Sequence, residues 1–376
     1  MERTKKKLAI ALGAAALSLT AAAGIGQAWA DDNGASQIPT SGDKLAGAPD
    51  SATLPWGTFT LDPKIAAKVK NHEPINYVFS YQASGIPLFS QQYMQGFKRG
   101  CEMGKAIYPM ECAAIAPVQT DPNQQVSQIE AKLAAGAIDC ISIEPVTSDS
   151  TTAIVNKLMA RGIPVFTVGV TSRGHEFTNF TQTPLKEGAT AAEIVLKWMD
   201  STGNHLKVFA VSGGDPAQFW AQGRMKGFRE AIEKAIPDAK FVVTEANAIN
   251  TSYDPGKTFD TYKAFLSAHP EVEFIENVDI GAEYADKAIV GLGRQGKAFT
   301  IGWNVSKGQL DAIENGVQAA LLDQRWPDQA AFGGPACAQF LANGVVLPNT
   351  QTLRPVLKAD VAQARTELDK ILSSGN

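Results

Sequence analysis

Apolar runs with the length of a strand alternate with amphipathic segments along most of the chain. Runs such as 75–79 and 165–168 are apolar almost throughout, which is typical of strands in a parallel sheet covered on both faces by helices. Between two such runs, Val126, Ile129 and Leu133 recur at helical spacing. The alternation predicts a doubly wound α/β fold.

The pattern runs twice, which predicts two lobes of the same class. The first set is expected to contain strands 75–79, 112–118, 139–143 and 165–168 and helices 91–103, 121–136 and 151–160. The second set is expected to contain helices 187–200, 219–235, 258–268 and 284–292 and strands 206–211, 239–244, 273–277 and 298–303, followed by a strand at 321–322 and helices 329–341 and 361–372. Gly96-Phe97-Lys98 and Gly227-Phe228-Arg229 occupy the same place in the two sets, which favours an internal duplication.

The first residues have the pattern of an export signal. A basic segment, 1–7, precedes an uncharged run, 8–25, and Ala28-Trp29-Ala30 supplies the small residues of a cleavage site. We therefore expect a signal peptide over 1–30 with cleavage near Ala30; the alternative is a membrane anchor of about the right length. Residues 31–72 are rich in Pro, Gly, Ser and Asp, and we interpret them as a flexible leader.

Charge and cysteine content narrow the possible functions. Residues 1–30 hold four of the 34 basic and one of the 38 acidic side chains, so the remainder has a net charge of −7, which disfavours nucleic acid and anionic membranes as partners. Four cysteines allow three pairings; we predict a disulfide between Cys101 and Cys112, which lie close together in the sequence. The scattered histidines and the lack of a C-x-x-C motif argue against a metal site.

Ligands of open parallel sheets bind outside the carboxyl ends of the strands. The loops predicted there and their edges carry flat aromatic and polar side chains, namely Tyr81, Phe89, Phe219, Trp220, Tyr253, Trp303 and Trp326 with Gln82, Gln222, Asp279, Asn304 and Gln324. This combination suits a ring with one apolar face and several hydroxyl groups. The alternative for any single aromatic is that it closes the end of the sheet as part of the core.

Three stretches then indicate a family: 84–89 (SGIPLF), 139–149 (DCISIEPVTSD) with 162–165 (GIPV), and 269–272 (HPEV) before 277–279 (NVD). In this order they resemble the type I periplasmic binding proteins of ABC sugar transporters, in the ribose and autoinducer-2 branch. The resemblance implies an N-terminal lobe of 73–184 plus 327–346 and a C-terminal lobe of 185–326 plus 347–376. It also implies a hinge of three segments, near 182–185, 324–327 and 347–352.

The resemblance also implies site residues. Phe89 matches an aromatic that packs on the sugar, and Gln222 lies where ribose binders place an arginine. The remaining matches are Tyr253 near a stacking aromatic, Asp279 at a polar residue on the ligand hydroxyls, Asn304 at an aspartate and Gln324 at a hinge glutamine. With Trp220 and Trp303 from the loops, these form the predicted ligand site. Pentose binders carry an Asp-Arg pair where this chain has Gly169-Val170, so the first lobe lacks an expected charged clamp.

The sequence therefore predicts an exported, periplasmic solute-binding component of an ABC transporter. It would act as a monomer without a cofactor, close around a sugar, polyol or sugar-like ligand, and deliver it to a membrane permease. One alternative is a sensor that reports to a chemoreceptor or a histidine kinase. The other is an exported α/β enzyme, but the chain has no G-x-S-x-G motif and no P-loop, so we expect no enzymatic activity. The sequence does not name the ligand.

Overall fold

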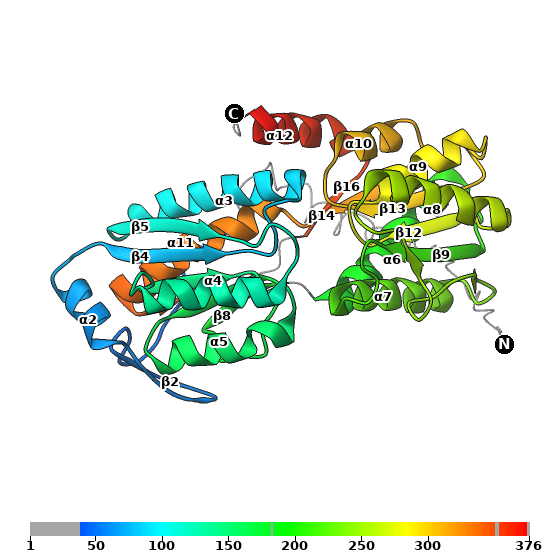
Figure 1. Ribbon diagram of the computed structural model, residues 1–376. Helices are drawn as coiled ribbons and strands as arrows, with labels where there is room; N and C mark the ends of the chain where they lie inside the picture. The colour runs from blue at the N-terminus through cyan, green and yellow to red at the C-terminus, as the bar shows by residue number, and fades with distance from the viewer. Residues whose placement is uncertain (1–37, 182, 350–352, 374–376) are drawn as a thin grey trace, which may run out of the picture. The chain divides into compact units, whose positions relative to one another are not determined.

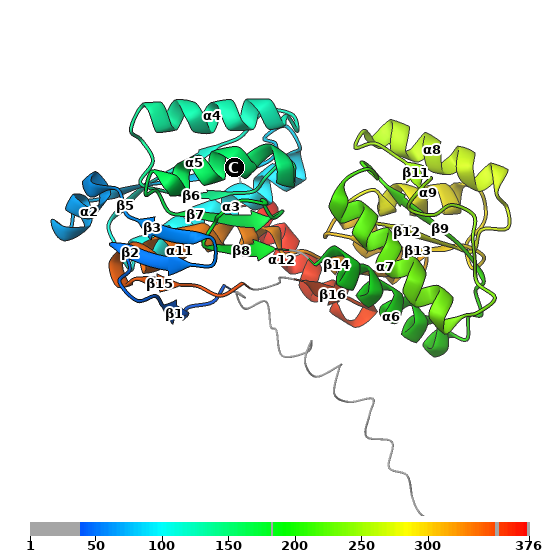
Figure 2. The same ribbon diagram turned by 90° about the horizontal axis from the view of Figure 1, so that it is seen from below.

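The computed structural model describes residues 38–181, 183–349 and 353–373, and it contains two large sheets (Figure 1). The first has five parallel strands in the order β5-β4-β6-β7-β8, with bounds β4 (Ile75–Ser80), β5 (Met110–Ile115), β6 (Cys140–Ile143), β7 (Val165–Gly169) and β8 (Thr178–Thr181). Helices α3 (Pro87–Lys105) and α11 (Trp326–Asn343) pack together on one face, and α4 (Pro122–Ala134) and α5 (Ser148–Ala160) pack together on the other (Figures 1 and 2).

The second sheet has seven strands, in the order β10-β9-β12-β13-β14-β16 with β11 also paired to β9. Its strands are β9 (Val208–Gly213), β10 (Lys240–Phe241), β11 (Ile249–Asn250), β12 (Phe274–Asn277), β13 (Phe299–Trp303), β14 (Gln318–Asp323) and β16 (Arg354–Val356), of which β16 alone is antiparallel to its neighbour. The helices are α6 (Pro184–Thr202), α7 (Phe219–Ala235), α8 (Pro255–Ala268), α9 (Ala282–Gly291), α10 (Lys307–Glu314) and α12 (Val361–Ser373), with a 3₁₀ turn at Lys358–Asp360.

The predicted strands and helices occur in the predicted order, because buried apolar runs form the strands and capped amphipathic segments form the helices. The Asp121 side chain accepts hydrogen bonds from two backbone N–H groups of the first turn of α4, and Pro122 follows it. The main difference is at 239–244, where only Lys240–Phe241 pairs as β10 and Ile249–Asn250 takes up the pairing with β9 as β11.

The interpretation of 31–72 as a flexible leader is wrong from Ile38 onward. Strands β2 (Ser51–Leu54) and β3 (Gly57–Thr60) form a hairpin, α2 (Pro63–Lys70) follows, and β1 (Asp43–Lys44) pairs with β15 (Val345–Val346). Four apolar residues of this segment, Ile38, Phe59, Leu61 and Ile65, are buried in the core of the first sheet. Their spacing is irregular, so a search for periodic patterns does not detect them. Residues 31–37 lie outside the described residues.

The repeated Gly-Phe motif has the same structural role in both halves. Gly96 of α3 contacts the backbone of Pro327 at the start of α11, and Gly227 of α7 contacts the backbone of Leu185 at the start of α6. A Cβ added at these glycines would lie 2.2 Å from the Pro327 carbonyl oxygen and 2.0 Å from the Leu185 carbonyl oxygen. Each glycine therefore permits close packing against a helix that begins within a predicted crossing segment, which agrees with a duplicated architecture.

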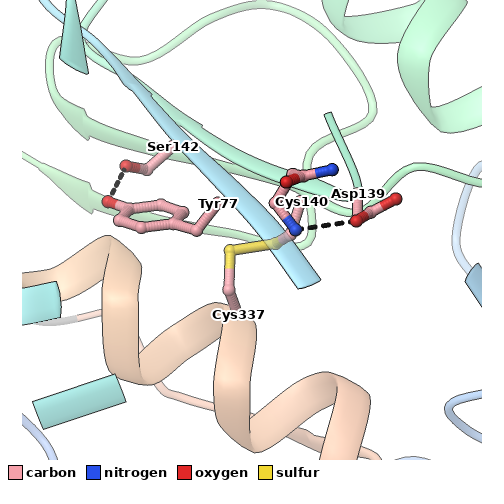
Figure 3. Close-up of a disulfide and its surroundings, with 6 residues drawn as sticks. Tyr77, Asp139, Cys140, Ser142 and Cys337 are labelled. Carbon is pink, nitrogen blue, oxygen red and sulfur yellow. Dashed lines mark hydrogen bonds between the residues drawn. A yellow bond between two sulfur atoms is a disulfide. The ribbon is translucent and has the colours of Figure 1, made fainter. Parts of the chain in front are cut away.

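Two disulfides join strands of the first sheet to helices that cover it. The predicted Cys101–Cys112 bond is present and joins α3 to β5. A second bond, Cys140–Cys337, joins β6 to α11 across 197 residues of sequence (Figure 3). Beside it the Tyr77 and Ser142 hydroxyls are hydrogen-bonded at 2.7 Å. This pairing was not predicted from the sequence, because 197 residues separate the two cysteines and strands β9 to β14 of the second sheet lie between them in the chain.

Both sheets share a strand order that reverses at one place. In the first sheet the reversal lies between β4 and β6, and in the second it lies between β9 and β12. The loops that leave neighbouring strands at such a point diverge to opposite faces, which leaves a crevice at the carboxyl ends of the strands. Ligand sites are therefore expected beside the ends of these four strands. Within the described ranges, none of the helices combines the length and apolarity needed to cross a bilayer.

Candidate functional site

A cavity lies at the carboxyl ends of strands from both sheets. Loops after β4, β5, β6 and β7 and the start of α3 supply Gln82, Ile86, Phe89, Thr120, Glu144 and Val170. The loops of the second sheet, helix α7 and the segment from β14 to α11 supply Trp220, Arg224, Tyr253, Asp279, Ile280, Asn304, Gln324 and Trp326. The lining thus combines aromatic and aliphatic side chains with a few amide and charged groups, as in typical small-molecule sites.

Glu144 lies at the reversal point of the first sheet. Its Oε1 accepts a hydrogen bond from the Tyr93 hydroxyl at 2.6 Å, and its Oε2 accepts a longer one from the Gln82 backbone N–H at 3.3 Å. Burial raises the pKa of the Glu144 carboxyl to about 8, although both hydrogen bonds act in the opposite direction. At neutral pH this wall of the cavity therefore carries a neutral acid.

Aromatic contacts fix the ring of Phe89 beside this acid. Phe89 meets Trp326 edge to face at 5.1 Å between ring centroids and lies 4.3 Å from Tyr93. Both neighbours are themselves buried, so the Phe89 ring has little rotational freedom. Edge-to-face pairs of this kind are favourable and geometrically specific. The cavity gains a rigid apolar face from α3 and α11.

Asp279 lies at the reversal point of the second sheet, after β12. Its two carboxyl oxygens accept hydrogen bonds from the Gly214 and Gly281 backbone N–H groups. The acid therefore ties the loop after β9 to the loop after β12. Burial raises its pKa above the ordinary value, while these N–H groups and Arg224 oppose the rise.

Arg224 is the one cation in the cavity lining, and its charge is paired with a carboxylate of the protein itself. Its Nε donates to Glu187 at 3.0 Å and its Nη1 donates to the Val278 carbonyl oxygen at 2.9 Å. The guanidinium lies over the ring of Trp303 at 3.7 Å from the centroid, with the Trp220 ring at 5.1 Å. Burial lowers the pKa of Arg224 while Glu187 raises it.

Asn304 and Gln324 connect the second sheet to the segment that leads into α11. The Asn304 Nδ2 donates to the Gln324 Oε1 at 3.1 Å, and the Gln324 backbone N–H donates to the Asn304 Oδ1 at 3.4 Å. Asn304 has a positive φ of 61°, a left-handed conformation that asparagine tolerates better than most side chains. Its carboxamide is thereby held at the cavity by the backbone as well as by Gln324.

The cavity brings together six of the eight predicted ligand residues, namely Phe89, Trp220, Tyr253, Asp279, Asn304 and Gln324. Gln222 does not line it, because its Nε2 donates to the Pro216 and Glu245 carbonyl oxygens. Trp303 does not line it either, because its ring is fully buried beneath Arg224.

Sequence reasoning missed two of the charged groups. Arg224 lies on α7 rather than in a loop at the end of a strand, so the search of those loops did not include it. It lies four residues after Trp220, on the same face of the helix, and this spacing could have identified it. Glu144 directly follows a predicted strand and could have been found. It lies next to Gly169, where an added Cβ would be 2.9 Å from the Glu144 Oε1. Across the described ranges, no three His, Cys, Asp or Glu side chains are grouped to share a metal ion.

Comparisons with known proteins agree with this architecture. The family model described as periplasmic binding protein domain matches residues 77–344. Among proteins with curated descriptions, none matches this sequence. The arabinose-binding protein AraP of Geobacillus stearothermophilus shares the fold with a TM-score of 0.62 and 21% identity, over 77% of this chain and 99% of that one.

Two inositol complexes are similar in the same way. A solute-binding protein of an ABC transporter from Bacillus halodurans with bound myo-inositol gives a TM-score of 0.66 at 17% identity, over 77% of this chain and 97% of that one. The Caulobacter myo-inositol-binding protein gives 0.65 at 15% identity, over 78% and 96%. The duplicated α/β architecture, the cavity at its strand ends and the match of the family model lead to one conclusion: this chain belongs to the periplasmic binding protein family.

Proposed function

We propose that this protein is the solute-binding component of an ABC transporter and holds a neutral, hydroxylated ring in the cavity between Phe89 and Asp279. The observation that carries this proposal is the lining itself, which combines aromatic faces with amides and acids at the strand ends of both sheets. C–H groups of a ring pack on aromatic faces, while amides and acids bind its hydroxyls. Two of the similar structures are complexes with myo-inositol, and a third is an arabinose-binding protein. Membership of the ribose and autoinducer-2 branch remains a prediction.

The charges in the cavity support a neutral ligand. Arg224 is paired with Glu187, Asp279 accepts two backbone N–H groups, and burial holds Glu144 in its neutral form at neutral pH. A phosphate or carboxylate on the ligand would have to compete with Glu187 for the guanidinium. Charge-assisted contacts are about twice as strong as neutral ones, so this competition would be costly. A polyol, a deoxysugar or another neutral ring fits the site better.

Binding would proceed by closure of two lobes about the crossing segments. We propose lobes of 73–184 plus 327–346 and 185–326 plus 347–376, with crossings near 182–185, 324–327 and 347–352. Residues 182 and 350–352 lie outside the described residues. A ligand that contacts both lobes favours the closed state because it has differential affinity for that state. The closed form would then deliver the ligand to a membrane permease, and the protein would act as a monomer.

We further propose that the protein binds without catalysing a reaction. The two acids and the arginine of the cavity lining are each engaged by groups of the protein itself, which leaves no activated nucleophile or base among these three groups. The family name implies a periplasmic location. The proposed signal peptide over 1–30, with cleavage near Ala30, lies outside the described residues.

Asp279→Asn is expected to weaken binding of a neutral ring by about 10- to 100-fold. The amide keeps the size of the acid but leaves one of two N–H groups without its charged acceptor, and hydrogen bonds to charged groups contribute about 1.5–3 kcal/mol. Calorimetric titration with D-arabinose and myo-inositol measures the change. Asp260→Asn, at an exposed position of α8, is the matched control. Equal affinity in the Asp279 variant and the wild type would place the ligand outside this cavity.

A further inference from the structure

Glu144 is connected through two buried side chains to the segment that joins the two sheets. The Tyr93 hydroxyl contacts the Glu144 Oε1 at 2.6 Å and the Gln329 Oε1 at 2.9 Å. The Gln329 Nε2 in turn donates to the Gln324 carbonyl oxygen at 3.0 Å. Glu144, Tyr93 and Gln329 are at most 3% exposed. A continuous path therefore links the cavity acid to Gln324, which also lines the cavity.

The number of protons on this path decides which contacts can form together. Because the Gln329 amide nitrogen donates to Gln324, its oxygen is the atom that faces Tyr93. Tyr93 has one hydroxyl proton, so it donates either to Gln329 or to Glu144. If it donates to Gln329, the 2.6 Å contact with Glu144 is a hydrogen bond only when Glu144 carries a proton and donates it to the Tyr93 oxygen. An ionised Glu144 can only accept, so the Tyr93 hydroxyl would donate its hydrogen bond to Glu144. Tyr93 would then no longer donate to the Gln329 oxygen.

The backbone at Gly169 leaves room for this arrangement. Gly169 has a φ of +65°, and a Cβ there would lie 2.9 Å from the Glu144 Oε1, 3.1 Å from the Gln329 Oε1 and 3.1 Å from the Tyr93 hydroxyl oxygen. All three polar atoms thus surround the position that a side chain of residue 169 would occupy. The absence of that side chain lets the three groups meet.

We propose that Glu144, Tyr93 and Gln329 form a proton-dependent relay in which the neutral form of Glu144 is the ligand-binding form, so that binding at this cavity is linked to a proton. The inference rests on the proposed function, because it concerns the same ligand site. With its proton directed to Tyr93, Glu144 lines the cavity as an uncharged group whose other oxygen can accept a hydrogen bond from a ligand hydroxyl. Loss of the proton would place a charge in the cavity and release Tyr93 from Gln329.

The groups around Glu144 set the direction of the pH dependence. Tyr93 faces it from α3, Gln125 of α4 donates to its backbone oxygen, and Arg224 and Asp279 share the cavity lining with it. Burial raises its pKa to about 8 in the protein without ligand, and a ligand that excludes water from the cavity raises it further. Affinity should therefore be constant below pH 7 and fall above pH 8, by at most about tenfold per pH unit.

The first arm of the test needs no ligand. Glu144→Gln mimics the neutral acid, so its melting temperature relative to the wild type should increase as pH rises from 5 to 8, by about 5 °C or more. The wild type loses stability over this range because the carboxyl must stay protonated when folded but ionises when unfolded. Asp286, whose pKa burial also raises to about 8, titrates in both proteins and cancels. Glu102→Gln, at an exposed position of α3, is the control and should follow the wild type.

The second arm is calorimetric titration with D-arabinose and myo-inositol between pH 7 and pH 9.5. We expect wild-type affinity to fall by up to about 30-fold, the affinity of Glu144→Gln to be independent of pH, and Tyr93→Phe to shift the pH at which the affinity falls, because Tyr93 contacts Glu144 in both protonation states. A constant melting difference in the first arm overturns the relay, and so does wild-type affinity that rises above pH 8 or an equal fall in Glu144→Gln. If the melting difference grows but neither ring binds, the proposed ligand class fails and the protonated Glu144 stands.

Discussion

Replacing Arg224 with leucine is expected to destabilise the protein by about 3–5 kcal/mol. The guanidinium is 1% exposed and so is paired with an acid, Glu187, whose side chain is 2% exposed. Removing it leaves that acid charged and buried without its partner, and the Val278 carbonyl oxygen loses a donor. The ring of Trp303 also loses the cation above it. Urea denaturation monitored by circular dichroism measures the loss.

A second substitution separates charge from packing in this prediction. Adding Glu187→Leu to Arg224→Leu also removes the acid that faced the guanidinium, and replacing both members of a buried ion pair with apolar residues is often close to neutral. The double variant should therefore recover most of the lost stability. Lys226→Gln on the same helix removes an exposed charge whose nearest acid is 3.8 Å away, and it should cost less than about 0.5 kcal/mol. A double variant no more stable than the single one would refute the role given to this pair.

Removing the Cys140–Cys337 disulfide, by alanine at both positions, is expected to cost about 5 kcal/mol. The bond closes a loop of 197 residues, and the chain-entropy model gives a stabilisation that grows with the logarithm of loop length. The Cys101–Cys112 bond closes a loop of only 11 residues, so the same model gives about 3 kcal/mol for it. The order of the two losses is therefore predicted as well as their size.

The two double-alanine variants are matched controls for each other, because each removes one disulfide between a strand of the first sheet and a helix packed on it. Guanidinium denaturation under oxidising conditions gives both free energies of unfolding. Equal losses, or a larger loss for the Cys101–Cys112 variant, would contradict the assignment of Cys140–Cys337 as the bond that fastens α11 to the first sheet.

The sequence predicted the order of strands and helices because both signals are local. Continuous apolar runs mark the strands of a covered parallel sheet, and six of the eight residues predicted as ligand contacts line the cavity. The prediction of a flexible leader was wrong from Ile38 onward, because the core residues of that segment do not recur at the spacing of a helix or a strand. Trp303 was predicted at the ligand site but does not line the cavity. Side chains alternate between the two faces of a strand, and the sequence does not say toward which face the last residue of β13 points.

The remaining differences depend on contacts between distant parts of the chain. Cys337 reaches Cys140 because α11 returns to the first sheet after strands β9 to β14 of the second sheet. Arg224 lines the cavity. Gln222 does not, because its Nε2 donates to the Pro216 and Glu245 carbonyl oxygens. Such pairings follow from the packing of α7 against its neighbours. Helical spacing alone gives the relative direction of two side chains but not the object that either of them meets.

Thermal unfolding of residues 31–376 with a panel of rings tests the central claim most directly. The panel pairs neutral compounds, D-arabinose, myo-inositol and a deoxysugar, with charged ones, a sugar phosphate and a uronic acid. A ligand that binds only the folded state at 1,000 times its Kd stabilises that state by about 4 kcal/mol. We predict that at least one neutral ring raises the melting temperature by several degrees in a saturable way, while the charged rings leave it unchanged. Stabilisation by the charged rings alone, or by none of the panel, would contradict the account.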